Sequence, residues 1–502
     1  MASVKKKIVR NTIANSLLKA SKYIINFLLF PFIISYVGAE DYGLYLLVGA
    51  FVGYFGLLEF GVGTSLVKYV AQYTTKEDEK TVNEMVNSSF LFYLGVGIAI
   101  CLSVIFIGYY FVDFFGVEGG QLDKARFIAI LVAIGALTSW PMRSFGSALK
   151  GLQRYDINMI IQFIVALVNA GATILILLNG GGIIDLIFWG IIIGAGGQLA
   201  TVIAVQRYLP YLDLKREYMT IKAMKKIFTF SSVIFVTQII GLVVLGTDRI
   251  VIGAFVSVAA ITHYAVARKL HDMVHTASAL PSSALLPAAT ELETKEDKKA
   301  IERLIFKGGK YKCALIIGTA TIIFILAEPI INLWMGPDYT FMTWPTQVYI
   351  SYWFVFAAWG VMGSVLLAQE KFKPLLMLYG TNAIANIILS IILVQRYEVL
   401  GVVLGTTIPY FFIMPIVIIS GLRLINIKFI KYVKKVILTT YPMALAAGGL
   451  LYSIIYLFPS ITDNIVGLGL TGLIGISTYF GLFYLFGLTA KEKSDVKKMF
   501  RS

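Results

Sequence analysis

One apolar segment, residues 256–289, carries a concentration of side chains that could bind a ligand. Its polar members are Tyr264, Arg268, Lys269, His271, Asp272 and His275. Tyr264, Arg268, His271 and His275 are separated by four, three and four residues, so on a helix they share one face. Asp272 follows Arg268 by four residues, the spacing at which an acid and a base pair on a helix.

Such a stripe is costly in an apolar environment. A charged group at the centre of a bilayer costs ~2.5–3.5 kcal/mol, so facing Arg268, Lys269 and Asp272 to lipid would cost on the order of 8 kcal/mol. The stripe therefore either lines a water-filled cavity or forms a self-neutralised cluster that holds two helices together. We favour the cavity. There a guanidinium could grip two phosphate oxygens and an ammonium could act as a point charge, which suits a pyrophosphate.

The two histidines of the stripe leave further alternatives open. His271 and His275 titrate near neutral pH and could sense protons, but two histidines four residues apart are also a common metal pair. No third ligand stands at a fitting spacing, so we predict neither a metal site nor a cofactor.

Charged residues in other apolar segments form a second set of candidates. Asp248 and Arg249 are adjacent and either neutralise each other or serve the ligand. Lys19 and Lys22, one turn apart, either line an inner mouth or reach toward the membrane surface, and we favour the surface.

Two more candidates stand alone in their segments. Glu59 is an acid with no base close to it in the sequence, which makes it a candidate for binding a coupling ion. Arg143 follows Pro141, and a proline kink could open the backbone toward a cavity.

Composition explains why these charges are unusual. The chain has 502 residues, of which 58% are apolar and 14% charged, and its mean hydropathy is +0.81. Such a chain belongs in lipid. Cys101 and Cys313 both lie in apolar runs, so we expect neither a disulfide nor a metal ligand from them.

Windows of about twenty residues predict an all-α polytopic membrane protein with about fourteen spans. They lie near 12–37, 42–71, 86–112, 126–149, 157–178, 184–208, 227–252, 256–289, 308–333, 343–368, 374–396, 398–422, 433–458 and 464–488.

Lysine and arginine set the expected orientation. Most of the 43 basic residues lie at the N-terminus, in the C-terminal tail and in the even-numbered loops. Because basic residues are retained on the cytoplasmic side, we expect a multi-pass protein of the cytoplasmic (inner) membrane with both termini inside. Basic loops that hold topology beside anionic membrane lipid also account for the net charge of +15, so we expect no nucleic-acid partner.

An internal repeat organises the spans. The run Thr75–Asp78 (TKED) recurs at Thr294–Asp297, and Tyr45 matches Tyr264, both 219 residues apart. An offset of six spans preserves orientation, so the halves are parallel repeats. The sequence thus predicts an N-terminal lobe over 1–212, a C-terminal lobe over 213–425 around a central cavity, and two appended helices with a cytoplasmic tail over 426–502.

Three short motifs resemble a known family. They are Val37–Tyr45 (VGAEDYGLY), Asp248–Gly253 (DRIVIG) and Trp334–Tyr339 (WMGPDY). The resemblance is to polysaccharide exporters and O-antigen flippases of the multidrug/oligosaccharidyl-lipid/polysaccharide transporter superfamily. It implies a two-lobed transporter that works by alternating access. Its cargo would be an undecaprenyl-pyrophosphate-linked oligosaccharide for O-antigen or other surface polysaccharide, with polysaccharide polymerase and assembly proteins as partners.

Other functions remain as alternatives. A lipid II-type flippase and a cation-coupled small-molecule antiporter use the same scaffold, but the central charges here are mainly basic, which favours an anionic cargo. Transport could be coupled to H⁺, Na⁺ or the membrane potential. The sequence has no Asp-x-Asp signature, no Walker-type glycine loop and no long outer loop with convergent acids, so we do not expect an enzyme.

Overall fold

A computed structural model of the chain describes residues 2–110, 119–279, 281–371 and 373–499, without the side chains of 2–20, 230, 232–246, 282–284, 287 and 496–499. Throughout this described part the regular elements are all helices. The contacts divide the chain into two compact units, Met1–Thr262 (unit 1) and His263–Ser502 (unit 2). The lobe boundaries at 212 and 425 that the repeat suggests stay predictions.

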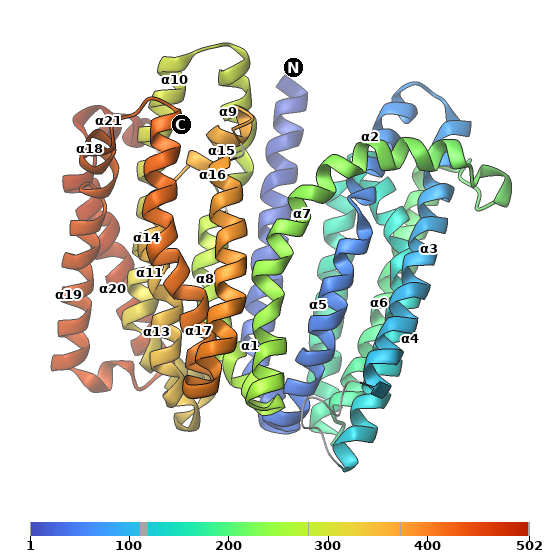
Figure 1. Cartoon of the computed structure of the whole chain (residues 1–502), viewed down its shortest axis with the longest axis horizontal. Helices are drawn as coiled ribbons and strands as arrows, with labels where there is room; N and C mark the ends of the chain where they lie inside the picture. Colours follow the sequence, from blue (N-terminus) through green and yellow to red (C-terminus); the bar gives the residue numbers. More distant parts are fainter. Residues whose placement is uncertain (1, 111–118, 280, 372, 500–502) are drawn as a thin grey trace. The chain divides into compact units, whose positions relative to one another are not determined.

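Unit 1 consists mainly of long helices (Figure 1). They are α1 (Ala2–Tyr54), the 3-10 turn η1 (Phe55–Glu59), α2 (Val62–Thr75), α3 (Glu79–Tyr110), α4 (Gly120–Gly151), α5 (Tyr155–Leu178), α6 (Ile183–Tyr208), α7 (Ile221–Phe255) and the first turn of α8 (Val258–Ala279). Helix α4 packs along α3, α2 and α6, and α1 packs on α5. Gly97 of α3 permits a close approach, because a Cβ there would lie 3.4 Å from the Cβ of Trp140.

Unit 2 is more segmented. After α8 it contains α9 (Ser282–Thr294), α10 (Lys298–Arg303), α11 (Gly309–Ile325), α12 (Ala327–Met335), α13 (Thr343–Ser351), α14 (Trp353–Phe356), α15 (Met362–Ala368), α16 (Lys373–Leu376), α17 (Asn382–Leu424), α18 (Phe429–Tyr432), α19 (Tyr441–Leu457), α20 (Ile465–Leu482) and α21 (Ala490–Met499). Helix α11 packs against α13, α19 and α20.

The helices have the properties of membrane spans. Among the described residues, nine helices are long and apolar enough to cross a membrane, or ten if Pro337–Trp359 and Met362–Ala368, bent by 50°, form one span. The all-α polytopic prediction is confirmed, whereas the count of fourteen stays a prediction. Two of the nine each contain a reversal of direction: Gly38 in α1 (φ 82°) and Glu398 in α17 (φ 49°) have non-helical backbone. Gly38 lies in the loop predicted between 37 and 42, and Glu398 is the first residue of the span predicted over 398–422, one residue after the predicted loop.

Three predicted spans are interrupted. The span predicted over 42–71 breaks at Phe60 and Gly61, which have φ of 49° and 72°. The span over 256–289 is described as α8 as far as Ala279, and α9 follows Pro281, a turn residue whose ring removes a backbone N–H. The span over 343–368 turns at Gly360, with φ of 52°. The part of the span predicted over 86–112 that follows Tyr110 lies outside the described residues.

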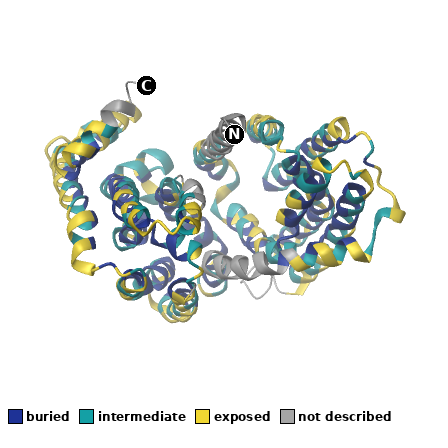
Figure 2. Cartoon of the chain, turned by 90° about the horizontal axis from the view of Figure 1, so that it is seen from above, coloured by how far each residue is buried: buried dark blue, intermediate teal, exposed yellow. Residues whose placement is uncertain are grey.

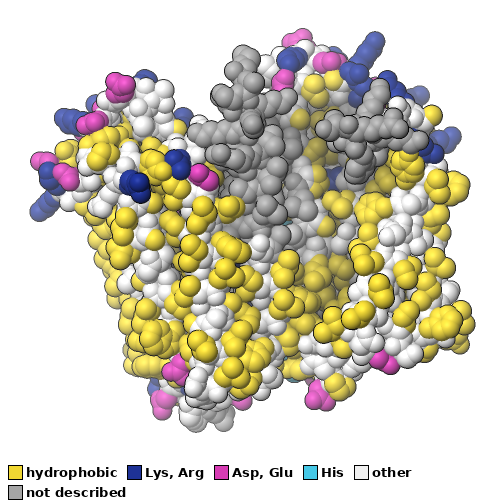
Figure 3. All heavy atoms as spheres, turned by 180° about the vertical axis from the view of Figure 1, so that it is seen from behind, with side chains coloured by type: hydrophobic (Ala, Val, Ile, Leu, Met, Phe, Trp, Pro, Cys, Tyr) yellow, Lys and Arg dark blue, Asp and Glu magenta, His cyan; other side chains and the backbone are white. Residues whose placement is uncertain are grey.

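Burial follows from the sequence pattern. Figure 2 shows buried residues on the sides that helices of one bundle turn toward each other, and exposed residues on the outward sides. On the face in Figure 3, hydrophobic side chains cover the helix flanks of each unit, and Lys and Arg gather mostly at one end. An apolar flank with a basic end is what a lipid-embedded surface with one cytoplasmic side requires.

A short helix is fastened to the end of unit 2. Lys310 of α11, with a side chain only 6% exposed, donates to Glu492 of α21 at 2.6 Å, and Lys307 donates to Asp495 at 2.8 Å. Burial opposes ionisation of Glu492, but the hydrogen bonds that it accepts from Lys310 and Thr489 outweigh burial and lower its pKa below the ordinary 4.5. The Lys310 ion pair holds α21 against α11, and the Lys307 ion pair holds it against the π-helical turn Leu304–Gly308 that precedes α11.

Candidate functional site

A helix break inside the membrane-spanning part of unit 1 exposes an acidic side chain. The 3-10 turn η1 ends at Glu59, and Phe60 after it has the left-handed backbone, with φ 49° and ψ 21°. This conformation is rare for a bulky residue, and it persists only where the surroundings hold it. Gly61 continues the left-handed turn before α2 begins. The helix is therefore interrupted directly after Glu59, between the 3-10 turn and α2.

Both oxygens of the Glu59 carboxylate are bonded within unit 1. The Arg143 guanidinium of α4 donates through Nη1 to Oε2 at 3.0 Å, and the Tyr93 hydroxyl of α3 donates to Oε1 at 3.3 Å. The side chain of Arg143 is 43% exposed and that of Glu59 is 29% exposed. The base is therefore the more accessible member of the pair.

Two neighbours fix this ion pair in place. The indole of Trp140 lies under the Arg143 guanidinium, with 3.8 Å between the guanidinium carbon and the ring centroid. Stacking occupies a face of the guanidinium and leaves its N–H edge for acceptors in the plane. A Cβ on Gly63 would lie 2.6 Å from Glu59 Oε1, so glycine leaves the carboxylate room that a larger residue would take away. We call Glu59, Gly63, Tyr93, Trp140 and Arg143 the Glu59–Arg143 site.

The polar stripe of α8 forms a second cluster, within unit 2. Arg268 donates through Nε to Asp272 Oδ1 at 3.0 Å and through Nη1 to the Tyr349 hydroxyl at 3.0 Å. The pairing that the spacing of four predicted is thus confirmed. The ring of His271 stacks on that of Tyr349, with centroids 4.2 Å apart. We call these residues, with Tyr264 and Tyr352, the α8 cluster.

The histidine of the α8 cluster has a defined role in the hydrogen bonding. Its Nδ1 lies 3.1 Å from Asp272 Oδ1 and its Nε2 lies 2.6 Å from the Tyr352 hydroxyl. A carboxylate only accepts, so Nδ1 is the donor and Nε2 of a neutral ring accepts from Tyr352. The His271 side chain is only 3% exposed. This histidine is therefore an internal link of the cluster.

Exposure in the α8 cluster runs opposite to that in the Glu59–Arg143 site. The Arg268 side chain is 17% exposed and that of Asp272 is 33% exposed. Here the base lies deeper than the acid, which is the arrangement of a cluster that neutralises a buried cation. Of the two sites, the Glu59–Arg143 site offers the more accessible guanidinium for an anion.

The structure places the remaining candidates as follows. Tyr264 is buried with its hydroxyl 3.0 Å from that of Tyr349, and His275 is exposed beside the Trp353 ring. Lys269 is partly buried on α8. Asp248 is buried and Arg249 partly buried near the end of α7. Lys22 of α1 donates to Gln162 of α5 at 2.9 Å, and the side chain of Lys19 lies outside the described residues.

Sequence reasoning missed the partners of these groups. It found Glu59 and Arg143 separately but did not pair them, and it passed over Tyr93, Trp140 and Tyr349. The available signal was that an acid and a base stood unpaired in separate apolar segments, each needing an opposite charge. In the part of the chain that the structure describes, no three His, Cys, Asp or Glu side chains gather in a group that could hold a metal ion.

Known proteins match the chain both in sequence and in fold. The family model described as "Polysaccharide biosynthesis protein" matches residues 8–293. The chain is 20% identical to the uncharacterized membrane protein EpsK of Bacillus subtilis (strain 168) over 62% of each chain, so it spans less than two thirds of that relative. It is 21% identical to a protein of Salmonella typhi named as an O-antigen transporter, over 76% of this chain and 87% of that one.

Solved structures share the fold. The lipid II flippase MurJ in its inward closed conformation matches with a TM-score of 0.73 and 16% identity, over 95% of this chain and 98% of that one. An inward-facing multidrug resistance MATE family transporter of the MOP superfamily matches with a TM-score of 0.67 and 12% identity, over 82% of this chain and 98% of that one. The family resemblance read from the sequence motifs is confirmed by the family match over residues 8–293.

Proposed function

Because the chain belongs to the family of polysaccharide biosynthesis proteins, we propose that it is a flippase for a lipid-linked oligosaccharide. It would carry an undecaprenyl-pyrophosphate-linked oligosaccharide across the cytoplasmic membrane by alternating access, for O-antigen or another surface polysaccharide. The names of its relatives, an O-antigen transporter and a lipid II flippase, support transport of such a cargo rather than enzymatic chemistry.

The observation that carries this proposal is the partly exposed guanidinium of Arg143. A guanidinium has five N–H donors, and Glu59 receives one of them. The Trp140 ring covers one face of the guanidinium and leaves its N–H edge open to acceptors. With that edge arginine can bind two phosphate oxygens at once. A pyrophosphate would thus find a positioned cation within an apolar bundle.

We propose that cargo and Glu59 exchange at Arg143. In the empty carrier the carboxylate neutralises the guanidinium, which lowers the cost of a charge among membrane helices. A pyrophosphate brings its own negative charge and replaces the carboxylate, which stays bonded to Tyr93. Departure of the cargo restores the ion pair, so neither state leaves an isolated cation.

The remaining assignments complete the proposal. Basic residues in the N-terminus, the even-numbered loops and the tail support cytoplasmic termini in the inner membrane. A polymerase and assembly proteins would act on the flipped oligosaccharide. Coupling to H⁺ or Na⁺ would need an acidic group that water can reach, and Asp272 is the more exposed partner in the α8 cluster. Coupling to the membrane potential would need only the net charge that moves with the cargo.

Export in cells tests the role of Arg143. In a strain whose own copy of the gene is deleted, Arg143→Ala at normal expression should abolish surface polysaccharide and accumulate lipid-linked oligosaccharide on the cytoplasmic side. The matched control is Arg154→Ala, since Arg154 pairs with Asp156 at 3.1 Å with similar exposures of 34% and 35% but lies between α4 and α5. Normal export with Arg143→Ala would contradict the proposed site.

A further inference from the structure

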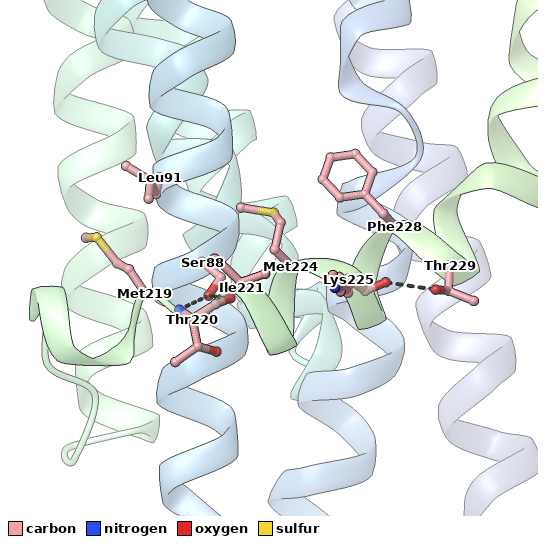
Figure 4. Close-up of a pocket in the computed structure, with 9 residues that line it drawn as sticks. All are labelled: Ser88, Leu91, Met219, Thr220, Ile221, Met224, Lys225, Phe228 and Thr229. Atoms are coloured by element: carbon pink, nitrogen blue, oxygen red, sulfur yellow. Dashed lines mark hydrogen bonds between the residues drawn. The ribbon is translucent and has the colours of Figure 1, made fainter.

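A separate pocket of about 460 Å³ lies in unit 1, between α3 and the first turns of α7 (Figure 4). Leu91 and Ser88 come from α3, whereas Met224 and Phe228 come from α7. None of these residues belongs to the Glu59–Arg143 site. The pocket has no part in the transport mechanism proposed above, so its lining requires another explanation.

Buried polar side chains of α3 hold the segment that leads into this pocket, and one of them, Ser88, lines it. Asn83 donates to the carbonyl of Tyr211 at 3.0 Å, and Asn87 donates to the carbonyl of Asp213 at 2.8 Å. Ser88 accepts from the backbone N–H of Thr220 at 3.0 Å, as Figure 4 shows. The segment between α6 and α7 is therefore fastened along α3, and the pocket is preformed. A preformed site loses less conformational entropy when a ligand binds.

The interior of the pocket is mainly apolar and open to the outside. Its apolar lining comprises Leu91, Met219, Ile221, Met224 and Phe228. Ile221 is 76% exposed and Leu91 is 43% exposed. Large apolar side chains this exposed on a membrane protein indicate contact with lipid rather than with water.

The apolar lining continues into the lipid-facing side of α3. Beyond Leu91, the side chains of Ile98, Leu102 and Phe106 are 46%, 64% and 54% exposed. These positions recur every four or seven residues, so they form one stripe along the helix. The stripe extends ~22 Å from Leu91 at 1.5 Å per residue. An acyl chain in the membrane could follow this stripe upward into the pocket.

The mouth of the pocket is basic. Lys225 lines it and Lys222 lies one turn before on α7, and both are exposed. Among the described acids, none forms an ion pair with either lysine. Lys226 differs, because its ammonium donates to the Tyr73 hydroxyl. Lys225 thus places positive charge at the pocket, and Lys222 adds a second exposed cation one turn away on the same helix.

We propose that this pocket binds one anionic diacyl phospholipid of the membrane leaflet on the basic side. The acyl chains would lie against Leu91 and the stripe of α3, and the phosphate would meet Lys222 and Lys225. The apolar pocket and stripe match the acyl chains of such a lipid, and the lysines match its phosphate. A soluble anion would contact only the lysines. The bound lipid would fix the first turns of α7 at the membrane surface.

Photolabelling locates the lipid. The full-length protein in phosphatidylcholine nanodiscs is titrated with a photoactivatable phosphatidylglycerol, and labelled peptides are mapped by mass spectrometry. We expect saturable labelling within residues 219–229, competed by unlabelled phosphatidylglycerol but not by added phosphatidylcholine. Equal labelling by a photoactivatable phosphatidylcholine would overturn the proposal, as would competition by inorganic phosphate at the same concentrations as phosphatidylglycerol.

Variants test the lysines. At ~1 kcal/mol for each lysine near an anionic headgroup, Lys222→Gln with Lys225→Gln should raise the half-saturating concentration roughly 30-fold. The matched control is Lys298→Gln with Lys299→Gln, which removes the same charge from exposed positions on α10. An equal change in both double variants would show a general surface-charge effect and contradict a specific site. Both double variants alter only exposed side chains, and near-unchanged export would confirm that each is folded.

Discussion

Neutralising the two members of the Glu59–Arg143 site separately and together distinguishes cargo binding from simple helix locking. Arg143→Gln removes the guanidinium that donates to Glu59 at 3.0 Å and leaves the carboxylate with Tyr93 alone. A hydrogen bond to a charged group contributes ~1.5–3 kcal/mol when buried, and an exposed ion pair contributes ~0–1 kcal/mol. With side chains 43% and 29% exposed, we expect the free energy of unfolding to fall by about 1–2 kcal/mol.

The double variant Glu59→Gln with Arg143→Gln should recover that loss. Two neutral amides can bond to each other and neither leaves an uncompensated charge, so we expect stability within about 0.5 kcal/mol of the original chain. Denaturant or thermal unfolding in detergent micelles measures all three variants. If the site only locks helices, export recovers together with stability. If Arg143 binds cargo, export stays lost.

Binding of purified lipid-linked oligosaccharide gives the decisive measurement. Loss of the Arg143–phosphate contact should weaken binding roughly 10- to 100-fold, from ~1.5–3 kcal/mol at 1.4 kcal/mol per tenfold. Glu59→Gln alone should tighten binding, because the carboxylate no longer competes for the guanidinium, while slow release reduces turnover. An Arg143→Gln variant that folds and binds cargo as tightly as the original chain would refute the exchange mechanism.

Three further expectations follow from individual contacts. Gly63→Ala places a Cβ 2.6 Å from the Glu59 carboxylate oxygen, so the carboxylate must move, and we expect reduced export with an unfolding free energy lower by about 1 kcal/mol, measured by surface polysaccharide and thermal unfolding. Arg268→Ala removes the guanidinium donor from Asp272, which keeps His271, and from Tyr349, which keeps the Tyr264 hydroxyl. Unfolding measurements should therefore show a loss of about 1.5–3 kcal/mol, and unchanged stability would contradict the role of Arg268 in holding the helices together. Because the pKa of Glu492 is lowered, its pairing with Lys310 stabilises the docked α21 at pH above its ordinary 4.5 and weakens as the pH falls through the lowered pKa. Amide hydrogen exchange over residues 490–495 should therefore accelerate in acid, and Glu492→Gln should exchange fast at every pH.

The two charged sites differ in which member of the ion pair is more exposed. In unit 1 the arginine is the more exposed partner, and in unit 2 the aspartate is. A group that meets an anionic cargo needs its N–H edge accessible, which Arg143 satisfies better than Arg268. The sequence alone favoured Arg268 because five polar neighbours surround it on one helix. In the structure Arg268 donates to Asp272 on its own helix and to Tyr349 on α13.

Local pattern in the sequence determined the membrane class, the helical fold and the position of the two reversals at Gly38 and Glu398. It also determined the Arg268–Asp272 pair, because residues four apart on a helix meet whatever the rest of the chain does. Hydropathy and helical period are properties of neighbouring residues, so they can be read without a fold.

Only the tertiary structure decided which charges meet across the bundle. Glu59 and Arg143 are 84 residues apart, and Arg268 and Tyr349 are 81 apart. Those contacts depend on which helices pack together and at what height, and on a break at Phe60 and Gly61 that turns Glu59 toward α4. The pocket beside α7 arises in the same way, because Asn83, Asn87 and Ser88 bind a segment about 130 residues downstream. The hydrophobic periodicity of the sequence does not predict such pairings, because they depend on how distant segments pack together.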